Sequence, residues 1–187
     1  MSQSPETAPL GTATGPNPVD TPRIYVACLA GYNHGHLHGR WIDATDAEEI
    51  RAAVTAMLAA SPIPDAEEWA IHDYEGFEGA RISEYAGFDS VAELAGFIEE
   101  HGTLGAKFYD HFGGDLEQAR AQFDDHAGEY KSLDEFAAQL HEDTGTEIPD
   151  ALQYYIDWDA LGRDMELNGD VFTIETGFER IQIFWSR

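Results

Sequence analysis

The feature that most limits how this chain can fold is its charge. It carries 36 Asp and Glu against 10 Lys and Arg, which gives a formal net charge of −26 at pH 7. Self-repulsion on that scale opposes compaction, so the excess is not an accident of solubility. It argues against a basic patch that would bind DNA, RNA or an anionic membrane, and it favours a positively charged partner.

The rest of the composition predicts a folded chain. The 187 residues are 43% hydrophobic and 12% aromatic, enough for a packed core, whereas a disordered acidic tail would be poor in aromatics. Cys28 is the only cysteine, so an internal disulfide is impossible and a reducing compartment fits. There is no apolar run of membrane-spanning length and no signal pattern, so we expect a cytoplasmic protein without a membrane partner.

The N-terminal half combines strand and helix signals. Prolines and small polar residues fill residues 1–22, which we expect to form a flexible leader. The elements predicted after it are a strand over Ile24–Ala30, a loop over Gly31–Arg40, a helix from the Thr45/Glu48 capping box to about Ala60, and a strand over Glu68–Asp73.

Helical signals dominate the second half until its end. Capping boxes begin at Ser90 and Ser132, and Asp115 is a further predicted cap. The predicted elements are helices over 90–101, 104–112, 116–125, 132–145, 150–156 and 157–167, and a hairpin of 171–175 and 180–185 that turns at Thr176 and Gly177. This order predicts an α+β fold of small subdomains rather than a doubly wound sheet.

Three alternating histidines, His34, His36 and His38, would share a face if the backbone were extended. Zinc normally takes a third or fourth ligand with orienting partners, and no spacing requires Cys28 or Asp43 to supply one. We therefore interpret the segment as a polar, glycine-rich loop and predict no metal site.

Enzyme signatures are absent from the sequence. It contains no nucleophile elbow, phosphate-binding loop or dinucleotide fingerprint. The Asp157-x-Asp159 run lacks calcium ligands where Leu161 and Asn168 stand. Acid pairs are abundant, but nothing singles out two of them as a catalytic acid and a nucleophile. We predict a non-enzyme without a cofactor.

Uncompensated acids are densest over residues 115–150, where eleven acids stand against Arg120 and Lys131. Acids seven residues apart, such as Glu135 and Glu142, share a helix face about 10.5 Å apart. Duplex DNA carries one negative charge per about 1.7 Å, so 26 net charges would match roughly 45 Å of duplex. A DNA imitator should thus be longer and thinner than a globule. The alternative is a generic acidic or salt-adapted protein with a structural role and charge on all surfaces.

Several blocks in a fixed order resemble one known family. The first is IYVACLAGYN over residues 24–33, continued by Leu37–Asp43. Later blocks are AIHDYE over 70–75, YIDW and GRD within 155–164, and VFTIE over 171–175. Together they resemble the ArdA antirestriction proteins, and the resemblance covers nearly all of residues 23–187.

The resemblance implies a DNA-mimicking inhibitor that fills the DNA-binding groove of type I restriction–modification enzymes and protects incoming DNA. Such proteins are carried by conjugative plasmids and transposons. It also implies an elongated, curved protomer that dimerises through its C-terminal part and binds no nucleic acid. The expected domains are an N-terminal α+β domain over 23–84, a central helical domain over 85–127 and a C-terminal α+β domain with dimer contacts over 128–187.

The family's antirestriction motif resembles residues 123–137, which read FDDHAGEYKSLDEFA. The resemblance implies that acids in and near it contact the enzyme, each contributing little because binding is spread over many charges. The expected partner-binding residues are Asp115, Glu117, Asp124, Asp125, Glu129, Asp134, Glu135, Glu142 and Asp143. The other motif residues, expected to pack a junction or dimer seam or, for the serine, to cap a helix, are Gly128, Tyr130, Ser132 and Phe136.

Overall fold

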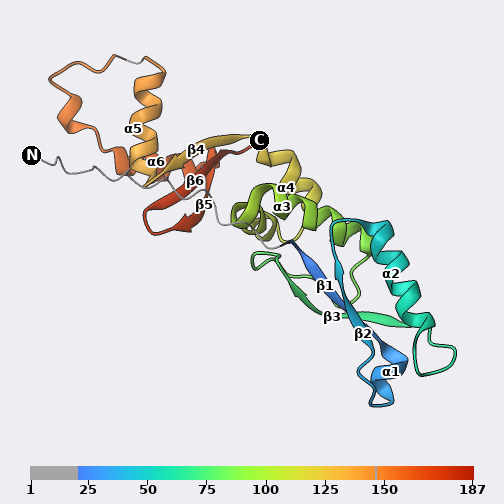
Figure 1. Ribbon diagram of the computed structural model, residues 1–187. Helices are drawn as coiled ribbons and strands as arrows, with labels where there is room; N and C mark the ends of the chain where they lie inside the picture. Colours follow the sequence, from blue (N-terminus) through green and yellow to red (C-terminus); the bar gives the residue numbers. More distant parts are fainter. Residues whose placement is uncertain (1–20, 146) are drawn as a thin grey trace, which may run out of the picture.

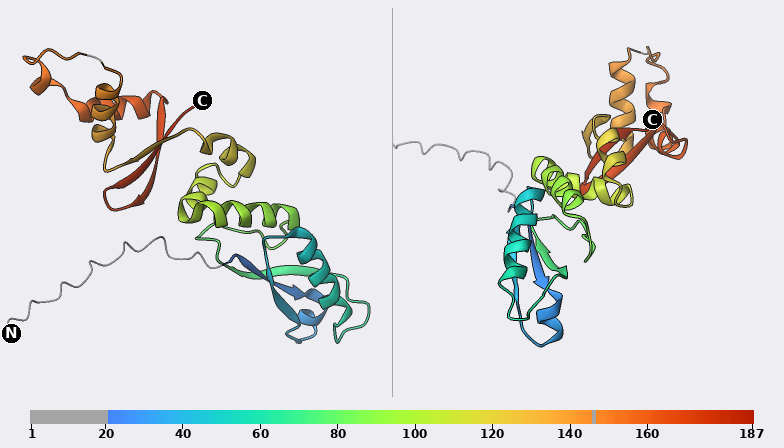
Figure 2. Two further views of the ribbon diagram at one scale, coloured as in Figure 1. Left: turned by 45° about the horizontal axis from the view of Figure 1, so that its top comes forward. Right: turned by 90° about the vertical axis from the view of Figure 1, so that its right-hand side faces the viewer.

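The computed structural model describes residues 21–145 and 147–187, which form an elongated body with a small sheet toward each end and helices between (Figure 1). Two further views show the same long outline (Figure 2). Most of the predicted leader lies outside the described residues. Its last residue is part of the fold, because Pro22 is buried and its carbonyl accepts a hydrogen bond from the Ala44 N–H (2.9 Å).

The N-terminal sheet has three antiparallel strands in the order β2-β1-β3. Alternate residues of the central strand point into the core, which is the pattern of a strand with one packed face. The strands are β1 (Arg23–Cys28), β2 (Gly39–Asp43) and β3 (Trp69–Glu75).

The chain after β1 departs from the predicted pattern. The strand ends at Cys28, two residues early, because a short helix, α1 (Leu29–Asn33), begins there with the Gly31 N–H donating to the Cys28 Sγ (3.3 Å). Strand β2 occupies the end of the expected loop, so that prediction was wrong. A glycine permits this pairing, since a Cβ on Gly39 would lie 2.6 Å from the Val26 carbonyl oxygen.

Helix α2 (Ala47–Ala59) covers the N-terminal sheet. Its predicted start was wrong by one residue: Asp46 is the N-cap, and its carboxylate accepts hydrogen bonds from the second and third N–H groups of the helix. Thr45 instead donates its hydroxyl to Asp43 Oδ1 (2.8 Å). The buried residues of α2, spaced for one helix face, are Ile50, Val54 and Met57.

Helix α3 (Phe88–His111) is interrupted at Gly102, whose φ of 58° and ψ of −143° are not helical. The predicted pair of helices separated at this glycine is therefore confirmed. The first of them begins two residues before the Ser90 capping box, so that box was a wrong start. Helix α4 (Leu116–Phe123) follows, with Asp115 as its N-cap as predicted.

The C-terminal sheet also has three antiparallel strands, in the order β4-β6-β5. The predicted hairpin is confirmed, although its turn falls on Phe178 and Glu179, two residues later than expected. Strand β4 was not predicted, because its HAGEY sequence lacks an alternation of apolar residues. The strands are β4 (His126–Tyr130), β5 (Val171–Gly177) and β6 (Arg180–Trp185).

Helices α5 (Leu133–Asp143) and α6 (Trp158–Leu167) pack against each other beside this sheet. Both were predicted. Asp157 caps α6 by accepting a hydrogen bond from the Ala160 N–H (2.9 Å). The helix expected over 150–156 is only a 3-10 turn, η1 (Gln153–Tyr155).

Three clusters of buried side chains follow one another along the body. The first lies between the N-terminal sheet, α2 and the first part of α3. The second joins α3 and α4 to the C-terminal sheet through Phe108 and Phe184, and the third contains Phe136 and Ile183. The α+β class is confirmed, whereas the division into three domains stays a prediction. Within the described ranges no helix has both the length and the hydrophobicity to cross a bilayer.

Candidate acidic docking surface

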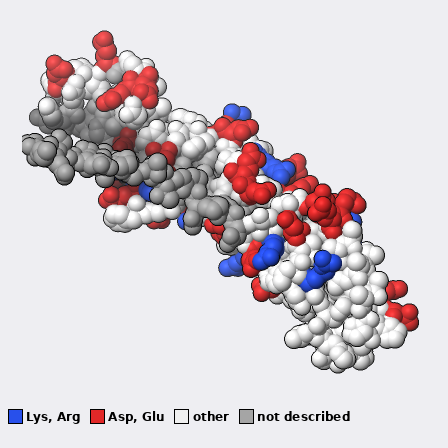
Figure 3. All heavy atoms as spheres, in the orientation of Figure 1, with Lys and Arg blue, Asp and Glu red and all other residues white. Residues whose placement is uncertain are grey.

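Nearly every carboxylate of the described chain faces solvent. Of the 36 Asp and Glu residues, all but Glu6 and Asp20 lie in the described ranges. Within those ranges every one is exposed except Asp125, which is 6% exposed. Figure 3 shows acidic side chains along the body from α5, past α3 and α4, to α2, and few near α1 on this face. The body therefore presents negative charge over most of its length.

The few basic side chains hold separate elements together instead of neutralising this surface evenly. The Lys107 Nζ of α3 donates to the backbone carbonyl of Glu175 in β5 (2.6 Å). The ion pairs that join residues far apart in sequence are Arg23–Glu75, Arg51–Asp89, Arg180–Glu129 and Arg187–Asp125. Because most of the described basic side chains are engaged in such contacts, most exposed acids in the described ranges have no Lys or Arg in an ion pair with them.

Helix α4 carries three of the predicted contact residues. Asp115 is its N-cap, where the Gln118 N–H donates to Oδ1 (3.0 Å) and holds the pKa of this carboxyl below its usual value. Glu117 lies in the first turn, and Asp124 is the C-cap residue. All three are exposed, so α4 presents acids at both ends.

Helix α5 carries four more of the predicted contact residues, two at each end. Asp134 and Glu135 lie in the first turn, where the helix dipole favours negative charge, and the Lys131 N–H donates to Glu135 Oε2 (2.7 Å). Glu142 and Asp143 end the helix, where the dipole opposes negative charge. Acids at that end cost helix stability, so stability alone does not account for them.

Two predicted contact residues are engaged within the protein. Asp125 is buried and forms an ion pair with Arg187, so a direct contact with a partner would require that pair to open. Glu129 Oε2 accepts hydrogen bonds from Arg180 (3.1 Å) and Gln182 (2.5 Å), and the hydrogen bond from Arg180 is the main reason that its pKa is lowered. Sequence reasoning missed both arginines, because no local pattern links β6 and the residues after it to a strand so far back in the chain.

The other motif residues lie where the motif turns from β4 into α5. The rings of Tyr130 and Phe136 meet edge to face at 5.1 Å, and Phe136 is buried. Gly128 has a φ of +134°, and a Cβ there would lie 3.1 Å from the Tyr130 ring. Ser132 occupies the N-cap position of α5, as predicted, but its hydroxyl makes no cap hydrogen bond. The Glu135 side chain instead binds the N–H of Lys131, the residue before the N-cap.

The histidine-rich segment forms no metal cluster in the described parts of the chain, where no three His, Cys, Asp or Glu side chains converge. The rings of His34 and His38 hydrogen-bond the backbone carbonyls of Ala30 and Met57, both at 2.7 Å. These contacts tie the loop between α1 and β2 to α1 and to α2.

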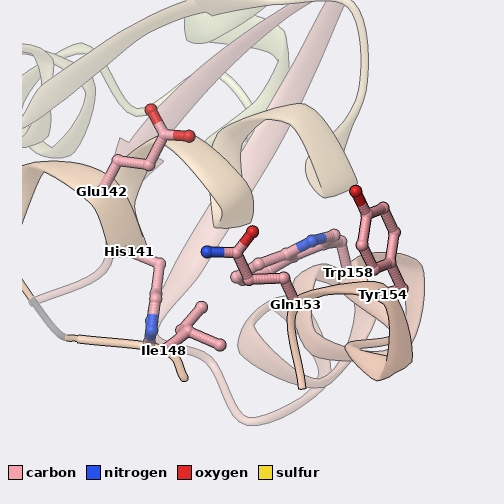
Figure 4. Close-up of a pocket in the computed structure, with 6 residues that line it drawn as sticks. All are labelled: His141, Glu142, Ile148, Gln153, Tyr154 and Trp158. Carbon is pink, nitrogen blue, oxygen red and sulfur yellow. The ribbon is translucent and has the colours of Figure 1, made fainter. Parts of the chain in front are cut away.

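A hollow of about 380 Å³ lies between α5, η1 and α6 (Figure 4). The Nε2 atom of His141 is buried beside it without a hydrogen-bond partner in the described structure, and the His141 ring packs 5.4 Å from that of Trp158. The side chains that line the hollow are His141, Glu142, Ile148, Gln153, Tyr154 and Trp158. This set places an imidazole beside aromatic rings without a serine, cysteine or lysine nucleophile.

Acidification should destabilise the protein through His101 at the α3–α4 junction, where its ring packs 4.6 Å from Phe97 and 4.0 Å from Phe123. Burial lowers the pKa of His101, so the unfolded chain binds this proton more readily than the folded one. The loss should begin as the pH falls through about 6.5, the unfolded value, and be complete below the folded pKa. Urea denaturation at pH about 7.5 and about 5.5 measures it.

The matched variant for this test is His101→Phe, which keeps a ring in the cluster and removes the titrating group. Its free energy of unfolding should change less between the two pH values than that of the wild type. An equal pH dependence in both proteins would contradict this origin.

Taken together, the fold and this surface define an elongated, acidic α+β protein. A family model described as "Antirestriction protein (ArdA)" matches residues 24–180. The chain therefore belongs to the ArdA family of antirestriction proteins, and the resemblance seen in its sequence blocks is confirmed. A comparison with curated proteins found no match.

Proposed function

We propose that the chain inhibits type I restriction–modification enzymes by placing carboxylates in their DNA-binding groove where DNA would place phosphates. Membership of the antirestriction family supports the general function. The single observation that carries the mimicry is an elongated body with exposed carboxylates along most of its length (Figure 3).

The physical basis is the electrostatics of DNA binding. A groove that binds duplex DNA neutralises closely spaced phosphates with Lys and Arg and releases counterions, so its affinity falls steeply with salt. Exposed carboxylates can meet the same cations with little rearrangement. The proposed direct contacts are the exposed predicted acids Asp115, Glu117, Asp124, Asp134, Glu135, Glu142 and Asp143, while Asp125 and Glu129 shape the motif from within.

A homodimer through the C-terminal part belongs to the same proposal. Between α5 and α6 the chain exposes apolar side chains, with Tyr154 94% and Tyr155 84% exposed and Leu152 half exposed. Exposed apolar groups close together mark protein contact sites. Two copies joined there would make a longer acidic body than one, as occupation of an extended DNA groove requires. The inhibitor would act in the cytoplasm, where incoming DNA meets the restriction enzyme, and it needs no cofactor.

Competition with DNA tests this function. A purified type I restriction enzyme is titrated with labelled DNA at low salt, with and without this protein. We expect the protein to displace the DNA and to lose that ability as salt is raised. Undiminished DNA binding at saturating protein would refute the proposal.

The same protein samples also test the alternative, a salt-adapted acidic protein that does not mimic DNA. Circular dichroism at about 50 mM and about 2 M salt reports whether the fold depends on screening of the charge. A DNA mimic should be folded at both concentrations, whereas folding only at molar salt, together with no competition, would favour the alternative.

A further inference from the structure

One carboxylate behaves unlike all the others in the described chain. Asp125 is 6% exposed, and its Oδ2 atom is buried without a hydrogen-bond partner. Its Oδ1 atom forms an ion pair with Arg187. A buried charge is costly unless it is paired, and in a chain of net charge −26 cations are scarce. The pairing of one of these few cations, Arg187, with Asp125 therefore needs a structural explanation.

Asp125 stands at the joint between the helical middle and the C-terminal sheet. It follows the C-cap of α4 and precedes β4, and its N–H donates to the Gln122 carbonyl (3.1 Å). Its own carbonyl accepts a hydrogen bond from the Trp185 N–H of β6 (2.9 Å). Both its backbone and its side chain are thus bound, by α4 on one side and, on the other, by the end of β6 and by Arg187, two residues beyond it.

Aromatic rings fill the interior of this joint. The ring of Phe184 lies 4.5 Å from Phe108, 5.9 Å from Phe123 and 5.3 Å from Phe172. Such contacts, with the hydrogen bond from Lys107 to the Glu175 carbonyl, stabilise the junction but do not involve Asp125. The buried Asp125 carboxylate must keep Arg187, whose side chain is 75% exposed, within reach, and this requirement restricts the orientations of the junction.

We propose that the Arg187–Asp125 ion pair is a latch that fixes the orientation of α4 and α3 relative to the C-terminal sheet. Arg187 is the positioning residue, and Asp125 is its buried anchor within the antirestriction motif. Arg187 lies beyond the segment that matches the family, residues 24–180, so family likeness does not predict it. The latch itself is independent of the proposed function. Its consequence for inhibition, a fixed path of the acidic surface through the joint, rests on that function.

Amide hydrogen exchange of Trp185, followed by NMR on the full chain, tests the latch directly. Arg187→Gln should speed this exchange by roughly tenfold, because it strands a buried carboxylate beside the bond that the amide makes. Replacing both partners, in D125N/R187Q, removes the ion pair without leaving an unpaired buried charge. If the pair holds the joint, exchange in this variant should stay more than about threefold faster than in the wild type. Should R187Q lose the native fold, the double variant alone carries the test.

The charge-matched control is Arg163→Gln. Arg163 pairs with Asp159 within α6 (3.2 Å) on an exposed surface, so its loss changes the net charge equally and leaves the joint intact. Exchange at Trp185 should then be unchanged. The latch is overturned if R187Q exchanges like the wild type, or if D125N/R187Q does, since Arg187 would then only offset a buried charge.

An inhibition assay separates the latch from the function. If the protein mimics DNA as proposed, R187Q should inhibit the restriction enzyme more weakly than R163Q, although both variants carry the same net charge. If R187Q exchanges faster at Trp185 but neither the wild type nor any variant inhibits the enzyme, the proposed function is refuted and the latch still holds.

Discussion

Neutralising four exposed acids together, Glu117, Asp124, Asp134 and Glu142, should weaken binding to the restriction enzyme by roughly a hundredfold at about 50 mM salt. Any one of these changes should weaken it by less than about threefold, because each exposed charge contributes little. These four make no side-chain hydrogen bond or ion pair with the described residues, so the amides should leave the fold intact.

The measurement is the apparent affinity from DNA competition over a range of salt concentrations. The slope of log affinity against log salt should become shallower in the fourfold variant, because fewer charged contacts release counterions. The control exchanges Asp for Glu and Glu for Asp at the same four positions, which keeps the charge and should keep inhibition within about threefold. A single substitution that abolishes inhibition on its own would contradict a distributed electrostatic contact.

Gly162→Ala should destabilise the C-terminal part of the protein by about 1–3 kcal/mol. Gly162 is buried where α6 crosses the start of α5, and a Cβ there would lie 2.6 Å from the Leu133 carbonyl oxygen. That neighbour is backbone, so it cannot turn aside as a side-chain tip would. The two helices must separate, which exposes the surfaces that hold α5 and its acids in place. Urea denaturation monitored by circular dichroism measures the loss.

Gly96→Ala is the matched control. Gly96 lies on the exposed side of α3, and a Cβ there would meet nothing within 4 Å. The same chemical change should stabilise the protein by about 0.4–1 kcal/mol, because alanine loses less conformational entropy than glycine in a helix. Equal effects of the two substitutions would contradict the close approach of α5 and α6.

The elements that could be predicted from sequence are those specified by neighbours along the chain. The Asp115 cap, the break at Gly102 and the C-terminal hairpin each depend on residues a few positions apart. The elements that were missed depend on partners far away. Strand β4 exists because β6 supplies its hydrogen bonds, and β2 exists because Gly39 can approach Val26. Neither pairing can be inferred from the residues adjacent to these strands in the sequence.

The candidate acidic surface, too, was only partly predictable from the sequence. The excess of acids predicted a basic partner, and the placement of Glu142 and Asp143 at a helix end could be inferred from the spacing of that helix. The engagement of Asp125 and Glu129 could not, because Arg187 and Arg180 reach them only through the β4–β6 pairing.

By itself the sequence determined the net charge, the approximate positions of most helices, the α+β class and, through its ordered blocks, the antirestriction family. Only the tertiary structure decided which carboxylates remain free in solvent and which one is buried. Charge is a sum over composition, whereas exposure depends on which residues meet when strands and helices distant in the chain pack together.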